Sequence, residues 1–215
     1  MSFWEYLLDR QDLLVFQGVQ HLSMVGQCLL AATLIALVLA AVVYRNDTAV
    51  GLAAATGAVG LTIPSFALLG LLVAITGFGI TPAVAALTFY AVLPILRNTV
   101  VGLAGVDQTL VDAARGMGMG RLRVLTRVEL PLAWPVVIAG MRVSGQMIMG
   151  VGAIAAYVGG AGLGGEIFSG LSRLGGANAL NSTLAGTLGI ALLALLLDLV
   201  LLGLSRLTTS RGIRA

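Results

Sequence analysis

The residues whose types and spacing could do chemistry together lie in a polar, arginine-rich segment between two long apolar stretches. The segment begins Asp112-Ala113-Ala114-Arg115-Gly116-Met117-Gly118, continues for nine residues to Val128, and closes with Glu129-Leu130-Pro131. Its paired alanines leave a smooth helical surface that can enter a groove on a partner, and Gly118 lets the chain turn afterwards because glycine tolerates positive φ. Leu130 and Pro131 then start the next apolar helix, since proline suits a first helical turn. The pattern predicts a docking surface.

Composition excludes several enzyme classes. The chain contains no lysine, so it lacks both the phosphate-binding P-loop, Gly-x-x-x-x-Gly-Lys-Ser/Thr, and the amine for Schiff-base catalysis. Cys28 and His21 are the single cysteine and the single histidine. They provide neither an intrachain disulfide nor a nucleophile framework or metal cluster. His21 is interpreted as an interfacial residue near the start of an apolar stretch. We therefore expect no catalytic residue, no metal and no cofactor bound by this chain.

Glycine-rich segments have two interpretations. The run Gly160-Ala161-Gly162-Leu163-Gly164-Gly165 matches the dinucleotide fingerprint Gly-x-Gly-x-x-Gly. It follows an apolar stretch, not a strand of a βαβ unit, and no acidic residue lies about twenty positions later, so we interpret it as a turn-rich loop. A second set of glycines within one apolar stretch predicts close packing between membrane helices, with flexibility of that helix as the alternative. This set is Gly140, Gly145, Gly150 and Gly152.

Arg142 and Asp198 lie inside apolar stretches. A charge near mid-bilayer costs about 2.5–3.5 kcal/mol, so such residues usually pair or face the protein interior. Arg142 lies about 16 Å along its helix from Pro131, and Asp198 lies about 12 Å before Arg206, at 1.5 Å per residue. Their similar depth predicts that they approach to salt-bridge or water-bridged distance within the bundle. The alternative interpretation is that one of them lines a translocation pathway.

The composition independently indicates a membrane protein. Hydrophobic residues make up 59% of the 215 residues and charged residues 10%, whereas an ordinary soluble domain has about 25% charged residues. The formal net charge of +3 comes from a chain whose twelve basic residues are all arginine. Basic residues that flank membrane spans explain this charge better than nucleic-acid binding does.

We expect an all-α integral membrane protein with five transmembrane helices. A spanning helix needs about 20 mostly apolar residues because the hydrocarbon core is about 30 Å thick. The stretches that qualify are residues 22–43, 52–75, 82–97, 134–158 and 183–204. Pro64 predicts a kink in the second. Phe89 and Tyr90 in the third either contact a cationic solute through their rings or pack against core or lipid. Pro64, Phe89 and Tyr90 are the candidate pathway residues.

The N-terminal residues differ from these spans. Aromatic and leucine side chains in residues 3–20 alternate with Glu5, Asp9, Arg10 and Asp12. This stretch is too charged to span and predicts an amphipathic helix that lies in the membrane interface. The expected organisation is an interfacial segment at 1–21, a transmembrane domain at 22–206 with the polar loop at about 105–131, and a tail at 207–215.

The distribution of arginine residues indicates the orientation of the chain in the membrane. If the polar loop is cytoplasmic, five spans place the N-terminus outside and the C-terminus in the cytoplasm. The cytoplasmic segments then hold Arg45, Arg97, Arg115, Arg121, Arg123, Arg127, Arg206, Arg211 and Arg214. Arg10 and Arg173 fall outside, so the distribution satisfies the positive-inside bias. The loop arginines are explained equally well by this bias and by pairing with acidic groups on a docked partner.

The pattern from Asp112 to Pro131 resembles the Glu-Ala-Ala cytoplasmic loop of the permease subunits of bacterial ABC importers. In that family the loop forms a short helix that docks into a groove on the ATPase subunit and transmits its motion. Asp112 replaces the usual Glu and Val128 the usual Ile, and both keep the chemistry. The resemblance implies an ATPase-coupling surface formed by Asp112, Ala113, Ala114, Gly118, Arg121, Arg123, Leu130 and Pro131.

Other segments resemble the osmoprotectant branch of the same family, the glycine betaine, carnitine and choline permeases. These segments are residues 63–70, 93–99, 116–119, 129–133 and 159–165. The resemblance implies a multi-pass protein of the bacterial inner membrane that works with a second permease, identical or paralogous. It also implies an ABC ATPase that uses ATP, an extracytoplasmic solute-binding protein, and a small zwitterion or quaternary ammonium as cargo.

The cargo and the class of transporter each have an alternative. The cargo of such a permease could be another small, amino-acid-like solute. A secondary transporter or channel would also consist of apolar spans but would need no ATPase, and the coupling loop argues against it. Dependence of uptake on ATP hydrolysis distinguishes these classes.

Overall fold

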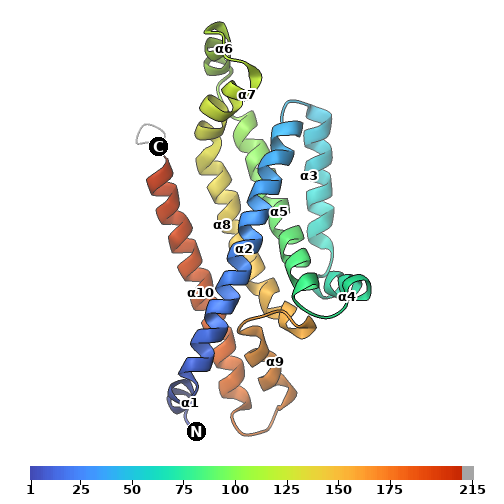
Figure 1. Ribbon diagram of the computed structural model, residues 1–215, viewed down its shortest axis with the longest axis vertical. Helices are drawn as coiled ribbons and strands as arrows, with labels where there is room; N and C mark the ends of the chain where they lie inside the picture. The colour runs from blue at the N-terminus through green and yellow to red at the C-terminus, as the bar shows by residue number, and fades with distance from the viewer. Residues whose placement is uncertain (210–215) are drawn as a thin grey trace.

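The structure is a computed structural model that describes residues 1–209, the side chain of Asp47 excepted. Within this part the predicted all-α class is confirmed (Figure 1). The α-helices are α1 Phe3–Asp9, α2 Gln11–Val43, α3 Asp47–Thr62, α4 Ser65–Thr76, α5 Ile80–Ala104, α6 Gln108–Gly116, α7 Arg121–Val124, α8 Leu130–Ala155, α9 Gly164–Ser172 and α10 Ala179–Thr208. A π-helix, η1 Leu125–Glu129, precedes α8, and a 3-10 helix, η2 Ala156–Val158, follows it. Arg211 and Arg214 of the expected tail lie outside the described residues.

The long helices share one axis, and successive ones run in opposite directions. α2 runs from the N-terminal end of the bundle to the end where α6 and α7 project, and α3 returns (Figure 1). α5 runs toward the α6 end again, α8 returns, and α10 runs in the same direction as α2. By length and hydropathy, the described residues contain 4 helices able to cross a membrane, or up to 5 if the bent pair α3–α4 counts as one span.

The predicted second span, residues 52–75, is divided at Pro64 by a sharp bend where a kink was expected. α3 ends at Thr62 and α4 begins at Ser65, with a bend of 91° between them. Pro64 explains the break because proline lacks an N–H donor and its ring collides with the carbonyl one turn earlier. α3 alone, about 24 Å long at 1.5 Å per residue, returns the chain along the bundle. α4 lies at its far end, turned away from the bundle axis (Figure 1).

Tyr90 stabilises this break. Its hydroxyl donates to the backbone carbonyl of Ile63 at 2.5 Å, and a carbonyl at a helix end needs such an external donor. The Tyr90 side chain is buried, and its ring meets that of Phe89 edge-on with 5.5 Å between centroids. The contact gives Tyr90 a structural role beside the Pro64 break.

The helix boundaries near the N-terminus also differ from those expected from the sequence. The single interfacial helix expected over residues 3–20 is divided, because α1 ends at Asp9 and α2 continues without a break from Gln11 to Val43. No proline interrupts this stretch, so the helical ladder extends beyond the apolar segment that predicted the span. α5 likewise continues past the predicted limit at Arg97 to Ala104.

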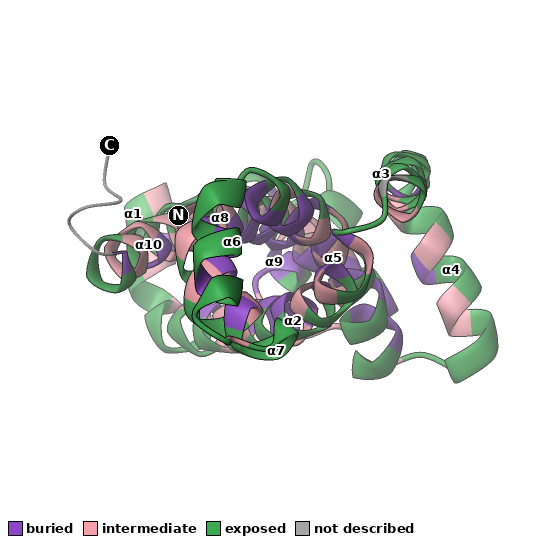
Figure 2. Cartoon of the chain, turned by 90° about the horizontal axis from the view of Figure 1, so that it is seen from above, coloured by how far each residue is buried: buried purple, intermediate pink, exposed green. Residues whose placement is uncertain are grey.

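The core lies between α2, α5 and α8, where the buried residues gather when the bundle is viewed along its axis (Figure 2). α10 lies on one side of this core and α3 and α4 on the other (Figure 2). Gly140 allows α8 to approach α5 closely, since a Cβ there would lie 2.8 Å from Asn98 Cβ and 3.1 Å from Ile95 Cα. Gly145 and Gly152 are also crowded, whereas Gly150 has nothing within 4 Å.

His21 belongs to this core, so its interpretation as an interfacial residue was wrong. The side chain is fully buried, and Nε2 lies 3.2 Å from the Met149 carbonyl oxygen. A Cβ at Gly162 would lie 2.5 Å from His21 Nδ1, which explains why a glycine with φ of +117° is needed there. The glycine run 160–165 connects a helical segment ending at Val158 to α9 and is preceded by no strand, as expected for a turn-rich loop.

We expect the substitution Gly140→Ala to lower thermal stability clearly, because the new methyl group would meet the backbone of α5 as well as Asn98. Gly150→Ala is the matched control on the same helix. It adds the same methyl group into open space and should be neutral or stabilising by about 0.5–1 kcal/mol through helix propensity. Thermal unfolding of the two purified variants in detergent measures the difference. Equal stability would contradict close packing at Gly140.

Candidate functional site

The polar segment forms a short helix that projects beyond one end of the bundle (Figure 1). α6 begins after Asp107, whose Oδ1 accepts a hydrogen bond from the backbone N–H of Thr109 at 2.8 Å. This hydrogen bond lowers the pKa of the Asp107 carboxyl, since it favours the ionised form. On the outer face, Asp112 Oδ1 accepts from Gln108 Nε2 at 3.1 Å and lies 3.4 Å from Arg115 Nη1. The Asp112 side chain is exposed, and it forms a local polar network with Gln108 and Arg115.

The inner face of α6 packs on the chain itself. Val111 and Ala114 are buried against Val124. Ala113 is exposed, whereas Ala114 is only 2% exposed. The expectation that both alanines form the outer surface was therefore wrong for Ala114. The helical period turns adjacent residues about 100° apart, so one alanine faces outward and the next faces the loop interior.

Gly118 lies at the turn after α6, with φ of +82°. This left-handed conformation is the one for which the sequence predicted a glycine, since other residues adopt it at a cost of about 1–2 kcal/mol. The turn redirects the chain from α6 into α7. Gly118 lines a concave surface with Arg121, Leu122, Arg123, Thr126 and Arg127.

Exposed apolar side chains share this outer surface with the arginines. Met117 and Leu122 are largely exposed, and Leu110 is half exposed. Arginine and methionine are enriched in protein interfaces, and exposed apolar groups at a loop tip indicate contact with a partner. Sequence reasoning missed these three residues. The signal was available, because each is an apolar residue within a charged segment.

The second half of the segment is a helical extension of α8 rather than a loop. α7, η1 and α8 follow one another without interruption from Arg121 to Ala155. Leu130 N–H donates to the Leu125 carbonyl, which is the wide π-helical pattern. Pro131 explains the widening, since its ring would collide with the carbonyl four residues earlier in a regular α-helix. Pro131 lies in the first turn of α8, as predicted.

Glu129 connects this extension to the end of α2. Its carboxylate is 5% exposed; Oε2 accepts from Tyr44 Oη at 2.6 Å and Oε1 from Arg45 Nη2 at 2.9 Å. Burial, followed by the hydrogen bond to Glu129, raises the pKa of Tyr44. Sequence reasoning assigned Glu129 no role of its own, although an acid directly before Leu-Pro at a span entrance was a signal. A buried carboxylate needs such partners, so Glu129 fixes α8 to α2 at the α6 end.

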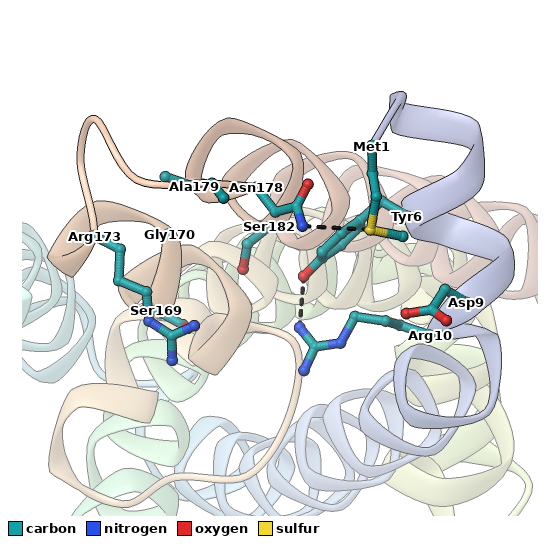
Figure 3. Close-up of a pocket in the computed structure, with 11 residues that line it drawn as sticks. Met1, Tyr6, Asp9, Arg10, Ser169, Gly170, Arg173, Asn178, Ala179 and Ser182 are labelled. Atoms are coloured by element: carbon teal, nitrogen blue, oxygen red, sulfur yellow. Dashed lines mark hydrogen bonds between the residues drawn. The ribbon is translucent and has the colours of Figure 1, made fainter.

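A similar carboxylate connects elements at the opposite end. Glu166 of α9 is buried, and its Oε2 accepts from Tyr6 Oη at 2.8 Å and from Ser182 Oγ at 2.8 Å. Arg10 Nη1 lies 3.3 Å from the same oxygen and donates to Tyr6 Oη at 2.6 Å. Figure 3 shows Tyr6 of α1 beside Ser182 and Asn178, with Arg10 next to the Tyr6 hydroxyl, around a cavity that all four residues line. α1 is thus attached to α9 and α10.

Arg142 and Asp198 form a bidentate ion pair between α8 and α10. Arg142 Nε lies 2.8 Å from Asp198 Oδ1, and Nη2 lies 2.7 Å from Oδ2. The close approach of Arg142 to Asp198 that their similar depths predicted is confirmed. The side chains are 35% and 18% exposed, so the pair lies at the edge of the bundle rather than in its centre. Parallel hydrogen bonds of this kind are among the stronger polar contacts in proteins.

The three candidate pathway residues lie near one another, but apart from the two intramembrane charges. Tyr90 and Pro64 meet at the α3–α4 break, and Phe89 is partly exposed beside Tyr90. Arg142 and Asp198 lie on other helices. The coupling residues, in contrast, all lie on the continuous stretch from α6 to the first turn of α8.

Comparison with known proteins assigns this architecture to a family. The model of the family described as binding-protein-dependent transport system inner membrane component matches residues 24–210. The chain belongs to this family. Family members are permease subunits of ABC transporters, which are not enzymes and do not carry the ATPase.

Relatives and solved structures agree with this membership. The chain is 34% identical over 210 residues, 98% of its length and 95% of the relative's, to the choline transport system permease protein OpuBB of Bacillus subtilis. It is 36% identical over 219 residues, covering both chains fully, to the osmoprotectant import permease protein OsmW of Salmonella typhimurium. A chain of the inward-facing MetNI methionine ABC transporter matches with a TM-score of 0.78 and 20% identity, over 94% of this chain and 99% of that one. The last likeness concerns the fold.

We expect Glu129→Ala to destabilise the permease by about 1–3 kcal/mol, because it leaves Tyr44 and Arg45 without their acceptor. Tyr44→Phe removes one hydrogen bond and should cost about 1 kcal/mol. Arg127→Ala, on the exposed face of the same extension, is the control and should change stability little. Thermal unfolding in detergent measures all three. A Glu129→Ala variant as stable as the control would exclude the connection from α8 to α2.

The pair Arg142–Asp198 predicts a different pattern for single and double variants. Arg142→Met or Asp198→Leu alone leaves one uncompensated charge at membrane depth, which is strongly unfavourable. The double variant leaves no uncompensated charge. The yield and thermal stability of each single variant should therefore be lower than those of the double variant. A double variant at least as unstable as the sum of the single ones would show that the residues act independently.

Proposed function

We propose that the chain is the transmembrane permease subunit of an ATP-driven importer for a small zwitterionic or quaternary ammonium osmoprotectant. One observation carries the proposal. The pattern from Asp112 to Pro131 folds as a short helix, α6, packed on an extension of α8 and placed beyond the bundle end with an outer face of arginines and apolar side chains. Such a surface suits docking on an ATPase subunit.

The relatives support the class of solute. Their names describe permeases for choline, carnitine, glycine betaine and osmoprotectants in general. The chain extends over at least two thirds of each of these relatives, so the proposal concerns the whole chain and not a shared fragment. In this proposal a separate solute-binding protein delivers the solute, and the partner ATPase uses the ATP.

The membrane arrangement proposed here has five crossings, by α2, α3, α5, α8 and α10. The α6 end is cytoplasmic and the α1 end is outside. Arg45, Arg115, Arg121, Arg123 and Arg127 then lie at or beyond the cytoplasmic end, and Arg10 and Arg173 at the outer end, in agreement with the positive-inside bias. α3 is short for a span, and tilt or local thinning of the bilayer accommodates such lengths at modest cost. A second permease, identical or paralogous, completes the pore, since a two-fold assembly is the common closed arrangement.

Reconstitution tests the function directly. The permease, its ATPase and its binding protein in proteoliposomes should take up glycine betaine, carnitine or choline only while ATP is hydrolysed. An amino acid serves as the competing solute. Uptake without ATP would contradict the importer and favour a secondary transporter or channel, and uptake of the amino acid alone would change the proposed solute.

A pair of leucine substitutions tests the docking surface. Leu122→Asp places a charge on the exposed face of α7 and should abolish co-purification with the ATPase and ATP-driven uptake, while membrane insertion continues. Leu174→Asp makes the same change at a residue of similar exposure, 78% against 72%, at the opposite end of the bundle. It should leave ATPase binding unchanged. Equal ATPase binding by both variants would exclude the α6–α7 surface as the docking site.

A further inference from the structure

Residues 106–129 form a unit that projects from the bundle and has few contacts with it. We call it the projecting unit. Inside it, the apolar face of α6 packs on Val124 and Val128 of the α7–η1 stretch. Toward the bundle, Leu125 packs against the apolar cluster that contains Tyr44 at the end of α2. Apolar packing has no preferred direction, so this contact alone does not fix the angle of the unit.

Glu129 supplies the directional contact between the projecting unit and the bundle. Within residues 1–209, the side-chain hydrogen bonds from the unit to the rest of the chain are those that its carboxylate accepts, from Tyr44 Oη at 2.6 Å and from Arg45 Nη2 at 2.9 Å. Arg45 Cζ also lies 5.0 Å from the centroid of the Tyr44 ring, so the three side chains contact one another in pairs. We call them the Glu129 triad. Hydrogen bonds weaken steeply away from their preferred angles, so the triad fixes the rotation of this helix as well as its distance from α2.

The triad lies at the last residue of the π-helix η1, Leu125–Glu129. One extra residue in a turn rotates the residues before it by about 100° relative to a regular α-helix. The direction in which α7 presents its outer face therefore depends on whether this turn stays wide. π-helical turns within α-helices are rare and frequently lie at functional sites. Because Tyr44 and Arg45 bind the residue at which the wide turn ends, they oppose a change of its register.

We propose that Glu129 is a positioning residue for coupling: through Tyr44 and Arg45 it fixes the orientation of the α6–α7 surface, so that movement of a docked ATPase is transmitted to α2. The inference rests on the proposed function and adds a contact within the chain to it. The backbone already connects the projecting unit to α5 and α8. The triad adds α2, which runs from the α6 end of the bundle to the α1 end and contributes to the same core (Figure 1). Loss of the triad leaves the docking surface in place but removes its fixed angle.

Glu129→Gln tests this role with a side chain of nearly the same shape. The amide oxygen can still accept from Tyr44 but carries no charge for Arg45. In proteoliposomes that contain permease, ATPase and binding protein, the variant should still bind the ATPase and hydrolyse ATP. The glycine betaine imported per ATP hydrolysed should fall about fivefold or more, the size of effect that a coupling contact supplies. Arg45→Gln should cause a similar fall, and the double variant should be no worse than either single one, because all three lose the same contact.

Glu166→Gln is the matched control. Glu166 is also a buried carboxylate with a tyrosine and an arginine as partners, Tyr6 and Arg10, but it lies at the opposite end of the bundle. The same substitution there should lower thermal stability to a similar extent and leave the solute imported per ATP unchanged. An equal ratio of uptake to ATP hydrolysis in the two variants would show that Glu129 has a structural role alone. Loss of ATPase binding in Glu129→Gln would also overturn the proposal, because the docking surface itself would then depend on the triad.

Spin labels measure the orientation of the α6–α7 surface without any transport. The parent is Cys28→Ala, and labels are attached at Val42→Cys on α2 and Leu122→Cys on α7, both of which are largely exposed positions. The labelled permease is diluted with unlabelled permease in lipid nanodiscs, so that each distance lies within one chain. The distance distribution should shift or broaden in Glu129→Gln and stay that of the parent in Glu166→Gln.

An unchanged distribution in Glu129→Gln would exclude positioning by the triad. ATP-driven uptake by the parent is measured separately. Its absence counts against the proposed function, whereas the distances between the labels are read in either case.

Discussion

The packing of α8 against α5 is the constraint on which the position of the projecting helices α6 and α7 depends. α6 and α7 lie between these two helices in the chain, so the α5–α8 pair determines where both stems of the projecting segment begin. Gly140 permits close approach to Ile95 and Asn98, and Ser144 Oγ donates to the Ala91 carbonyl at 2.8 Å. Burial of apolar side chains drives association weakly in lipid, so close backbone approach and such interhelical hydrogen bonds supply much of the attraction.

Two buried carboxylates then attach the N-terminal helices to this framework. Glu129 binds Tyr44 and Arg45 at the α6 end of the bundle. Glu166 binds Tyr6, with Arg10 beside it, at the opposite end. In both places a tyrosine hydroxyl and an arginine satisfy one carboxylate, which is the arrangement that makes a buried charge tolerable. Glu129 therefore joins the extension of α8 directly to the end of α2.

Polar groups of the long apolar helices satisfy one another or a backbone group. Arg142 and Asp198 satisfy each other through two parallel hydrogen bonds, and Tyr90 satisfies a carbonyl at the Pro64 break. These groups stabilise the fold.

The sequence alone determined the all-α membrane class, the family, the turn at Gly118 and the common depth of Arg142 and Asp198, because each depends on composition, local spacing or distance along one helix. Tertiary structure alone decided the partners of Glu166 and Glu129, which lie 160 and 85 residues away. It also decided that Ala114 faces inward and that the chain turns by 91° at Pro64. These features depend on how each helix is rotated and placed against its neighbours, and a helical period fixes the faces of a helix but not what each face meets.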